Sequence, residues 1–180
     1  MKLAVRLAQI VVVLSLLVVV IGFLLPQQQR VERSIVINAP ATQVFPWVNS
    51  AKAFHRWSPW AESEPDLMVS WFGPEQGKGA GMKWESMRSG PGSWTITHVV
   101  DGKRVDVALE FGGQNKATSW FELAPVVGGT QVTWGFETDA GMNPIHRWFG
   151  LMLDDWVGQD YERGLHRLQE TVEGRVDIPV

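Results

Sequence analysis

Residues 7–25 form an uninterrupted apolar stretch near the start of the chain. They read LAQIVVVLSLLVVVIGFLL, carry no charge, and include fifteen Leu, Ile, Val or Phe among nineteen residues. As a helix this stretch would be about 28 Å long, close to the roughly 30 Å of bilayer hydrocarbon. A helix that packs on a soluble core keeps one polar face, and this stretch has none. We therefore predict one N-terminal transmembrane helix.

The same stretch is better explained by a retained anchor than by a cleavable signal peptide. It exceeds the roughly 7–15 apolar residues of a signal peptide, and GFLLPQQQR offers no small-residue cleavage site. Lys2 and Arg6 precede it, whereas Arg30 and Arg33 follow it with Glu32 between them. This slight positive-inside bias favours a single-pass protein of the cell membrane, with a cytoplasmic N-terminus and the domain outside.

Beyond the apolar stretch, alternation of apolar and polar residues predicts a set of strands. VERSIVINAP at 31–40 is the first, and six more follow between about residues 67 and 139. The short links at 101–102 and 127–129 contain glycine and require antiparallel neighbours. The six later strands are predicted in LMVSWF, GAGMKWESM, SWTITHVVD, KRVDVALEF, KATSWFELA and GTQVTWGFET.

Two short helical segments are predicted between the first strand and the others. Pro40 suits the first turn of a helix over ATQVFPWVNS. Pro46 lies inside that segment and removes one helical hydrogen bond, so we expect the helix to be kinked or short. AKAFHRW predicts the second segment, which the Ser-Pro pair at 58–59 should end.

The last predicted element is a long amphipathic helix. Asn143 and Pro144 form a strong start signal, and the helix should end near Gly174. Gly158 and Gly164 interrupt it, and each costs about 1 kcal/mol of helix stability relative to alanine. A glycine at such a cost indicates close approach of another backbone or a ligand. Its apolar face is predicted from residues at helical spacing: Phe149, Leu153, Trp156, Leu165, Leu168 and Val172.

This order of elements predicts an α+β fold. Strands and helices do not alternate, which excludes a doubly wound parallel sheet. One curved antiparallel sheet around the C-terminal helix is the compact solution. We predict an anchor and spacer at 1–30, a domain at 31–174 and a C-terminal tail at 175–180.

Charge and motifs restrict the chemistry. Without residues 1–30 the chain carries 13 basic and 19 acidic residues, a net charge of −6, which argues against a nucleic-acid partner. Cysteine is absent, which excludes disulfides and thiolate catalysis. No hydrolase, zinc-protease or phosphate-loop motif is present, and no two of the four histidines lie three or four residues apart. We predict no catalytic residue, no metal and no cofactor.

Five segments in this order carry a family resemblance: SIVINAPATQVFPWV, WSPW, GPEQGKGAGMKWE, GTQVTWGFE and DYERGLHRLQE. They resemble the START-like superfamily, also called SRPBCC, of polyketide cyclase/dehydrase and lipid-transport proteins. The resemblance covers roughly residues 31–174. It implies a helix-grip fold, with an elongated apolar cavity between sheet and long helix that binds a lipid, sterol, polyketide or similar molecule. The internal Pro46 and the N-terminal anchor depart from the simple pattern, and a single-pass anchor on such a domain suggests a bacterial protein.

Tryptophan is the outlier of the composition, with ten among 180 residues. Its side chain suits a core, a cavity wall and a membrane interface alike. Within the implied cavity, the candidate ligand-binding residues are Trp57, Trp60, Trp84, Trp94, His98, Trp120, Trp134 and Trp156. Each tryptophan could instead fill the core, and the pair around the 58–59 turn could close the core beneath it.

His98 is the candidate of greatest chemical interest. If Trp94, Ile96 and Val100 point inward, strand alternation turns His98 inward as well. There it would be either a core histidine bonded to a neighbour, or a group that orients a ligand or moves a proton.

Three functions remain open at this stage. The first is a membrane-tethered, non-catalytic module that binds a hydrophobic small molecule or lipid. The second is a cyclase-like or hydratase-like enzyme on an apolar substrate, with His98 or an inward carboxylate as proton carrier. The third is an interaction domain whose cavity is filled by its own side chains. Protein partners are not predicted.

Overall fold

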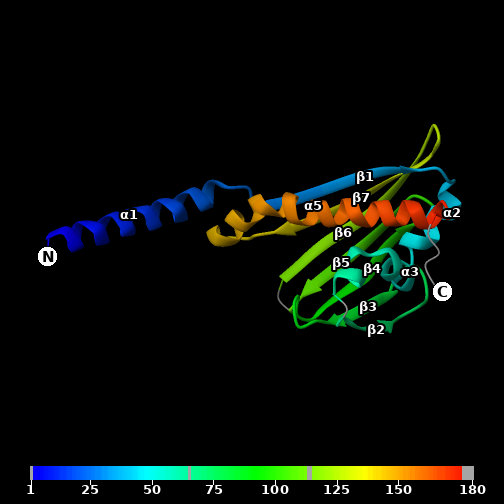
Figure 1. The fold of residues 1–180 in the computed structure, drawn as a ribbon, viewed down its shortest axis with the longest axis horizontal. Coiled ribbons are helices and arrows are strands. Elements are labelled where there is room, and N and C mark those ends of the chain that lie inside the picture. The colour runs from blue at the N-terminus through cyan, green and yellow to red at the C-terminus, as the bar shows by residue number, and fades with distance from the viewer. Residues whose placement is uncertain (1, 65, 113–114, 176–180) are drawn as a thin grey trace.

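The computed structural model describes residues 2–64, 66–112 and 115–175, with the side chains of all of these except residues 2–5, 8 and 115. The long helix α5 runs along a single antiparallel sheet, and α1 projects from one end of this domain (Figure 1). The helices are α1 (Lys2–Leu24), α2 (Ala41–Val48), α3 (Ala51–Trp57), α4 (Pro59–Ser63) and α5 (Pro144–Val172). The strands are β1 (Gln28–Ile37), β2 (Met68–Phe72), β3 (Gly81–Glu85), β4 (Gly92–Val100), β5 (Arg104–Phe111), β6 (Asn115–Val126) and β7 (Gly129–Asp139).

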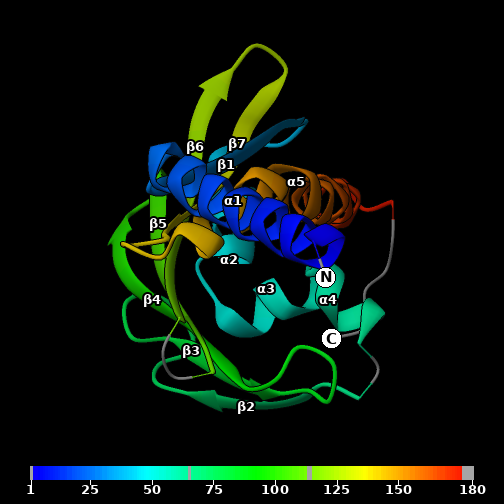
Figure 2. The same ribbon diagram turned by 90° about the vertical axis from the view of Figure 1, so that its left-hand side faces the viewer.

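The described strands form one sheet in the order β1-β7-β6-β5-β4-β3-β2. Strands β2 to β7 are a meander in which each pairs with its neighbour in sequence, and β1 pairs with β7 at one edge. The sheet curls around α3 and α4, while α5 lies along its β1 edge (Figure 2). The predicted α+β class, with a curved antiparallel sheet and a long C-terminal helix, is confirmed.

The short helices differ from the prediction at the Ser58-Pro59 turn. This turn ends α3, as expected, but it also begins the additional helix α4. The Ser58 hydroxyl accepts from the backbone N–H of Trp60, and Pro59 occupies the first helical position. Pro46 lies within the eight-residue helix α2, which is short as predicted.

Gly158 and Gly164, two of the three glycines of α5, each lie against a side chain from the sheet, Arg33 and Trp134 respectively. A Cβ atom on Gly158 would lie 2.1 Å from Nη2 of Arg33. Arg33 crosses this gap and donates to Asp154 at 3.0 Å and to Glu162 at 2.7 Å. The hydrogen bond from Arg33 holds the pKa of Asp154 below its ordinary value. The expected close approach is present, although side chains rather than a backbone or ligand make it.

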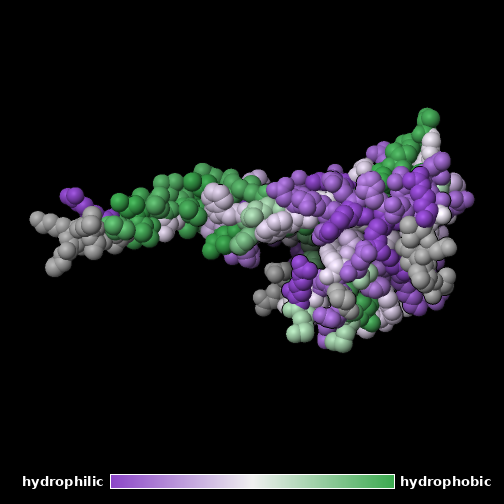
Figure 3. All heavy atoms as spheres, viewed as in Figure 1, coloured by the Kyte–Doolittle hydropathy of each residue, from purple (hydrophilic) through white to green (hydrophobic). Residues whose placement is uncertain are grey.

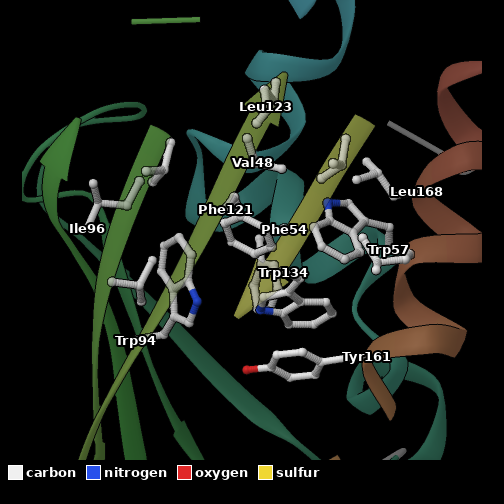
Figure 4. Packing of buried hydrophobic residues seen from close by; sticks show 14 of the residues in the cluster. Val48, Phe54, Trp57, Trp94, Ile96, Phe121, Leu123, Trp134, Tyr161 and Leu168 are labelled. Carbon is white, nitrogen blue, oxygen red and sulfur yellow. The ribbon is translucent and has the colours of Figure 1, made fainter. Parts of the chain in front are cut away.

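Aromatic side chains dominate the core between the sheet and the helices (Figure 4). The ring of Phe54 stacks on Trp94 with centroids 5.0 Å apart, and it meets Trp57 and Trp134 edge-on. Trp57 is fully buried, and its indole N–H donates to the carbonyl of Trp47 at 2.9 Å. Trp57 therefore closes the core beneath the turn.

The C-terminal end of α1 is fastened to α5 by a buried arginine. Arg147 donates to the carbonyls of Phe23 at 2.8 Å and Leu25 at 3.2 Å, and also to that of Gly141. The last carbonyls of a helix lack partners within it, so a cation there satisfies them and complements the helix dipole. The indole N–H of Trp148 adds a hydrogen bond to the Val18 carbonyl at 3.0 Å.

The described apolar side chains of α1 are mostly exposed, and they colour its surface as hydrophobic in Figure 3. In the part of the chain that the structure describes, no helix was found that is long and apolar enough to cross a membrane. The structure does not confirm the predicted transmembrane span.

Candidate ligand-binding cavity

A cavity of about 470 Å³ lies between the concave face of the sheet and α5. Strands β3 to β7 supply one wall, and α3, α4 and α5 supply the other. Sites for small molecules commonly measure about 300–1,000 Å³ and are mostly apolar. The cavity therefore has the size and lining of a site for a hydrophobic molecule.

Five of the predicted tryptophans line this cavity: Trp60, Trp84, Trp94, Trp134 and Trp156. They come from α4, β3, β4, β7 and α5, so residues far apart in sequence meet around one space. Trp156 is 53% exposed, which places it where the cavity opens to the surface. The predicted aromatic lining is therefore present in the structure.

Trp57 and Trp120 lie away from the cavity wall. Trp57 is fully buried in the core. Trp120 lies on the outer face of the sheet, where its ring centroid is 4.7 Å from the Arg30 guanidinium and 5.6 Å from that of Arg104. Its neighbours Ser119 and Phe121 point inward, and strand alternation turns Trp120 to the opposite face.

The predicted inward orientation of His98 is wrong. Trp94 and Ile96 are buried, but His98 is exposed. The pairing of β4 with β5 shifts register between Ile96 and His98, as it does at a β-bulge. The irregularity interrupts the alternation on which the prediction rested, so His98 does not face the cavity.

The predicted apolar face of α5 is only partly correct. Leu165 and Leu168 are buried, whereas Phe149 and Trp156 are 54% and 53% exposed. Tyr161, which the prediction missed, is buried on the inward face. Its spacing of four residues from Leu165 is the signal that could have identified it.

Exposed apolar residues form a stripe on the N-terminal half of α5. Ile145, Phe149, Met152 and Trp156 are spaced by four, three and four residues, which places them on one helical face. We call these four residues the α5 stripe. It begins beside Pro144, which abuts Gly22 of α1, and it ends at the cavity opening. Figure 3 shows the apolar surface of α1 reaching the N-terminal end of α5.

Polar side chains are also among the residues that line the cavity. The carboxylate of Glu64, after α4, accepts from the hydroxyls of Ser86 at 2.5 Å and Ser89 at 2.9 Å. This bridge ties α4 to the loop between β3 and β4. His55 lies edge-on to Trp71 at a centroid distance of 5.5 Å, and burial lowers its pKa, which keeps the imidazole neutral at neutral pH.

A buried trio of polar side chains, Ser119, Trp134 and Tyr161, belongs to the cavity wall. The Ser119 hydroxyl lies 2.8 Å from the Gly135 carbonyl, 3.0 Å from Nε1 of Trp134 and 3.3 Å from the Tyr161 hydroxyl. Within the described residues, no cluster of three His, Asp or Glu side chains is arranged to hold a metal ion.

The sequence of the chain matches the family described as polyketide cyclase/dehydrase and lipid transport over residues 28–173. The chain belongs to this family. The predicted resemblance to the START-like, or SRPBCC, superfamily is thereby confirmed. No curated protein sequence matches the chain.

Solved structures of similar fold include a protein of Rhodobacter sphaeroides, with a TM-score of 0.60, 17% identity, and coverage of 81% of this chain and 93% of that one. A protein of Chromobacterium violaceum has a TM-score of 0.57, 16% identity, and coverage of 81% and 98%. CalU16 from Micromonospora echinospora has a TM-score of 0.52, 14% identity, and coverage of 85% and 76%. At these identities the likeness concerns the fold alone.

Proposed function

We propose that this protein is a membrane-tethered, non-catalytic module that binds a hydrophobic small molecule or lipid. The cavity of about 470 Å³ between the sheet and α5 carries this proposal. Its lining combines five tryptophans with aliphatic side chains, and it opens to the surface beside Trp156. Burying an apolar ligand there removes its apolar surface from water. This burial favours binding by about 25 cal/mol for each Å² removed.

The two alternatives have less support. An interaction domain filled by its own side chains would lack a cavity of this size. An enzyme would need a proton carrier at the ligand, and His98, its first candidate, is exposed outside the cavity. The second candidate, an inward carboxylate, is represented by Glu64 and Asp160, which line the cavity. Both carboxylates are already bonded, Glu64 to Ser86 and Ser89 and Asp160 to Arg163. The family includes cyclase-type members by its description, but no group of the cavity favours a particular reaction.

The tether is proposed from residues 7–25 and from the way α1 joins the domain. That stretch carries no charge, and its described Leu, Ile and Val side chains are mostly exposed in α1. Arg147 holds the end of α1 against α5, which keeps the α5 stripe near any membrane that contains α1. We propose a cytoplasmic N-terminus and a domain outside, where a ligand can pass between bilayer and cavity without entering water.

Ligand binding can be tested with 1-aminoanthracene, whose fluorescence increases in apolar surroundings. The full chain in lipid nanodiscs should bind this probe more than empty nanodiscs do. Ala117 lines the cavity and is buried, so Ala117→Trp should fill the space and remove the extra signal. The exposed Ala124 provides a matched control, because Ala124→Trp should bind like the wild type. An undiminished signal in the Ala117→Trp protein would contradict the proposed site.

The tether can be tested by carbonate extraction of membranes from expressing cells. Val12→Arg combined with Val19→Arg costs about 5–7 kcal/mol of insertion free energy if both positions lie near the bilayer centre. That protein should appear in the soluble fraction, whereas the wild type and a Val12→Ala, Val19→Ala control should stay in the pellet. Release of the wild type by carbonate would refute the tether and leave the cavity proposal untouched.

A further inference from the structure

The Ser119 hydroxyl fixes the direction of the hydrogen bonds in the polar trio. A serine hydroxyl has one proton and two lone pairs. The Gly135 carbonyl is the nearest partner at 2.8 Å and can only accept, so it takes the serine proton. The Trp134 indole at 3.0 Å can only donate. The remaining lone pair of Ser119 therefore accepts from the Tyr161 hydroxyl at 3.3 Å.

Tyr161 is consequently left with acceptor capacity alone. Its only proton is used by Ser119, and its oxygen keeps a lone pair. Tyr161 lines the cavity, and Figure 4 shows its hydroxyl directed away from α5, toward the side of the cluster where Trp94 lies. Burial raises the pKa of Tyr161, so the phenol is neutral throughout the physiological range.

The position of this acceptor is fixed by packing. The Tyr161 ring stacks on Trp134 with centroids 3.7 Å apart and planes 11° from parallel. Trp134 in turn lies against Gly164, where a Cβ atom would be 2.7 Å from the ring. An acceptor held in this way loses little conformational entropy when a ligand binds.

The charged groups of the lining are also unfavourable for an anionic ligand. The carboxylates of Glu64 and Asp160 border the cavity, and that of Asp160 also forms an ion pair with the exposed Arg163. Lys116 also borders it, but its ammonium group lies 3.4 Å from the carboxylate of Glu110. A ligand carboxylate would therefore meet like charges and an acceptor rather than a free cation.

We propose that the cavity selects a neutral apolar molecule that carries a hydroxyl or N–H group, which donates a hydrogen bond to Oη of Tyr161. This rests on the proposed function, since it assumes that the cavity binds apolar ligands. It narrows the ligand class to alcohol-like, phenol-like or amide-like molecules and excludes fatty-acid anions. Tyr161 and Ser119 are the residues that set this specificity.

Three probes with one carbon skeleton test the proposal: 2-naphthol, 2-methoxynaphthalene and 2-naphthoate. Their affinities for the full chain in nanodiscs would be measured by calorimetry, with empty nanodiscs subtracted. We expect 2-naphthol to bind about fivefold more tightly than its methyl ether, the size expected of one neutral hydrogen bond. The naphthoate should bind more weakly than both.

Tyr161→Phe keeps the ring and removes the acceptor, so the preference for 2-naphthol over the ether should fall to less than twofold. Leu153→Ala is the matched control, because Leu153 lines the cavity without a polar group. It should weaken both neutral probes equally and preserve their ratio. Should Tyr161→Phe fail to fold, the three affinities of the wild type still decide whether the cavity prefers a neutral hydrogen-bond donor.

The outcomes separate this inference from the function on which it rests. Equal binding of naphthol and ether, tighter binding of naphthoate, or an unchanged preference in Tyr161→Phe would overturn the inference and leave a general binding cavity. Failure of all three probes to bind the wild type would overturn both the inference and the proposed function.

Discussion

Trp134 and Trp120 are almost equally buried, at 1% and 6% exposure, yet they belong to opposite faces of the same sheet. Trp134 on the concave face stacks on Tyr161 and lines the cavity. Trp120 on the outer face is covered by the guanidinium groups of Arg30 and Arg104. Burial alone therefore does not identify a binding residue, because long cationic side chains can cover an aromatic ring as fully as a core does.

The largest expected difference between the two faces is in stability. Trp134→Ala should lower the free energy of unfolding by about 3–5 kcal/mol, as large-to-small changes of buried aromatic residues do. Trp120→Ala should cost roughly 2 kcal/mol, because the flexible arginines can close over the gap. Denaturant unfolding of the full chain in detergent, followed by near-ultraviolet circular dichroism, measures both. Equal losses of unfolding free energy would mean that the two faces of the sheet contribute equally to stability, contrary to this prediction.

A second, smaller contrast uses the glycine that lies against each ring. A Cβ atom on Gly164 would be 2.7 Å from Trp134, and one on Gly135 would be 2.1 Å from Trp120. Both Gly→Ala changes should destabilise the protein by about 1–3 kcal/mol through overpacking. Only Gly164→Ala should also weaken binding of 1-aminoanthracene, because it displaces a cavity wall. Weakened binding in Gly135→Ala would show that the two faces are coupled.

The smallest effect is expected from the arginine side chains that lie over Trp120 on the outer face of the sheet. Arg30→Gln removes one guanidinium from Trp120 and should cost less than about 1 kcal/mol, the size of an exposed cation–π contact. Probe binding should be unchanged. A measurable loss of binding would contradict the assignment of this face as structural.

The sequence predicts most of the fold because its periodicities are long and clear. Glycine turns at 101–102 and 127–129 identify antiparallel neighbours, and Asn143 with Pro144 marks the start of α5. The pairing of β1 with β7 was not predicted, since no local signal names the partner of the first strand. The attachment of α1 by Arg147 joins segments more than a hundred residues apart, and it has no local signal either.

The candidate site is predicted less completely, for two physical reasons. Alternation assigns residues to two faces but does not survive a register shift, which is how His98 was misplaced. Trp120 could have been placed correctly, because its neighbour Phe121 is a core residue and adjacent strand residues face opposite sides. The trio with Ser119 and Tyr161 depends on side-chain geometry across β6, β7 and α5, which periodicity does not contain.

Native mass spectrometry of the full chain, released from nanodiscs and followed by organic extraction, tests the central claim most directly. We predict a defined additional mass on the wild type, its loss in Ala117→Trp, and its retention in Ala124→Trp. Recovery of a neutral apolar molecule would identify the ligand of the cavity. A wild type that carries no additional mass and binds none of the naphthalene probes would contradict the account.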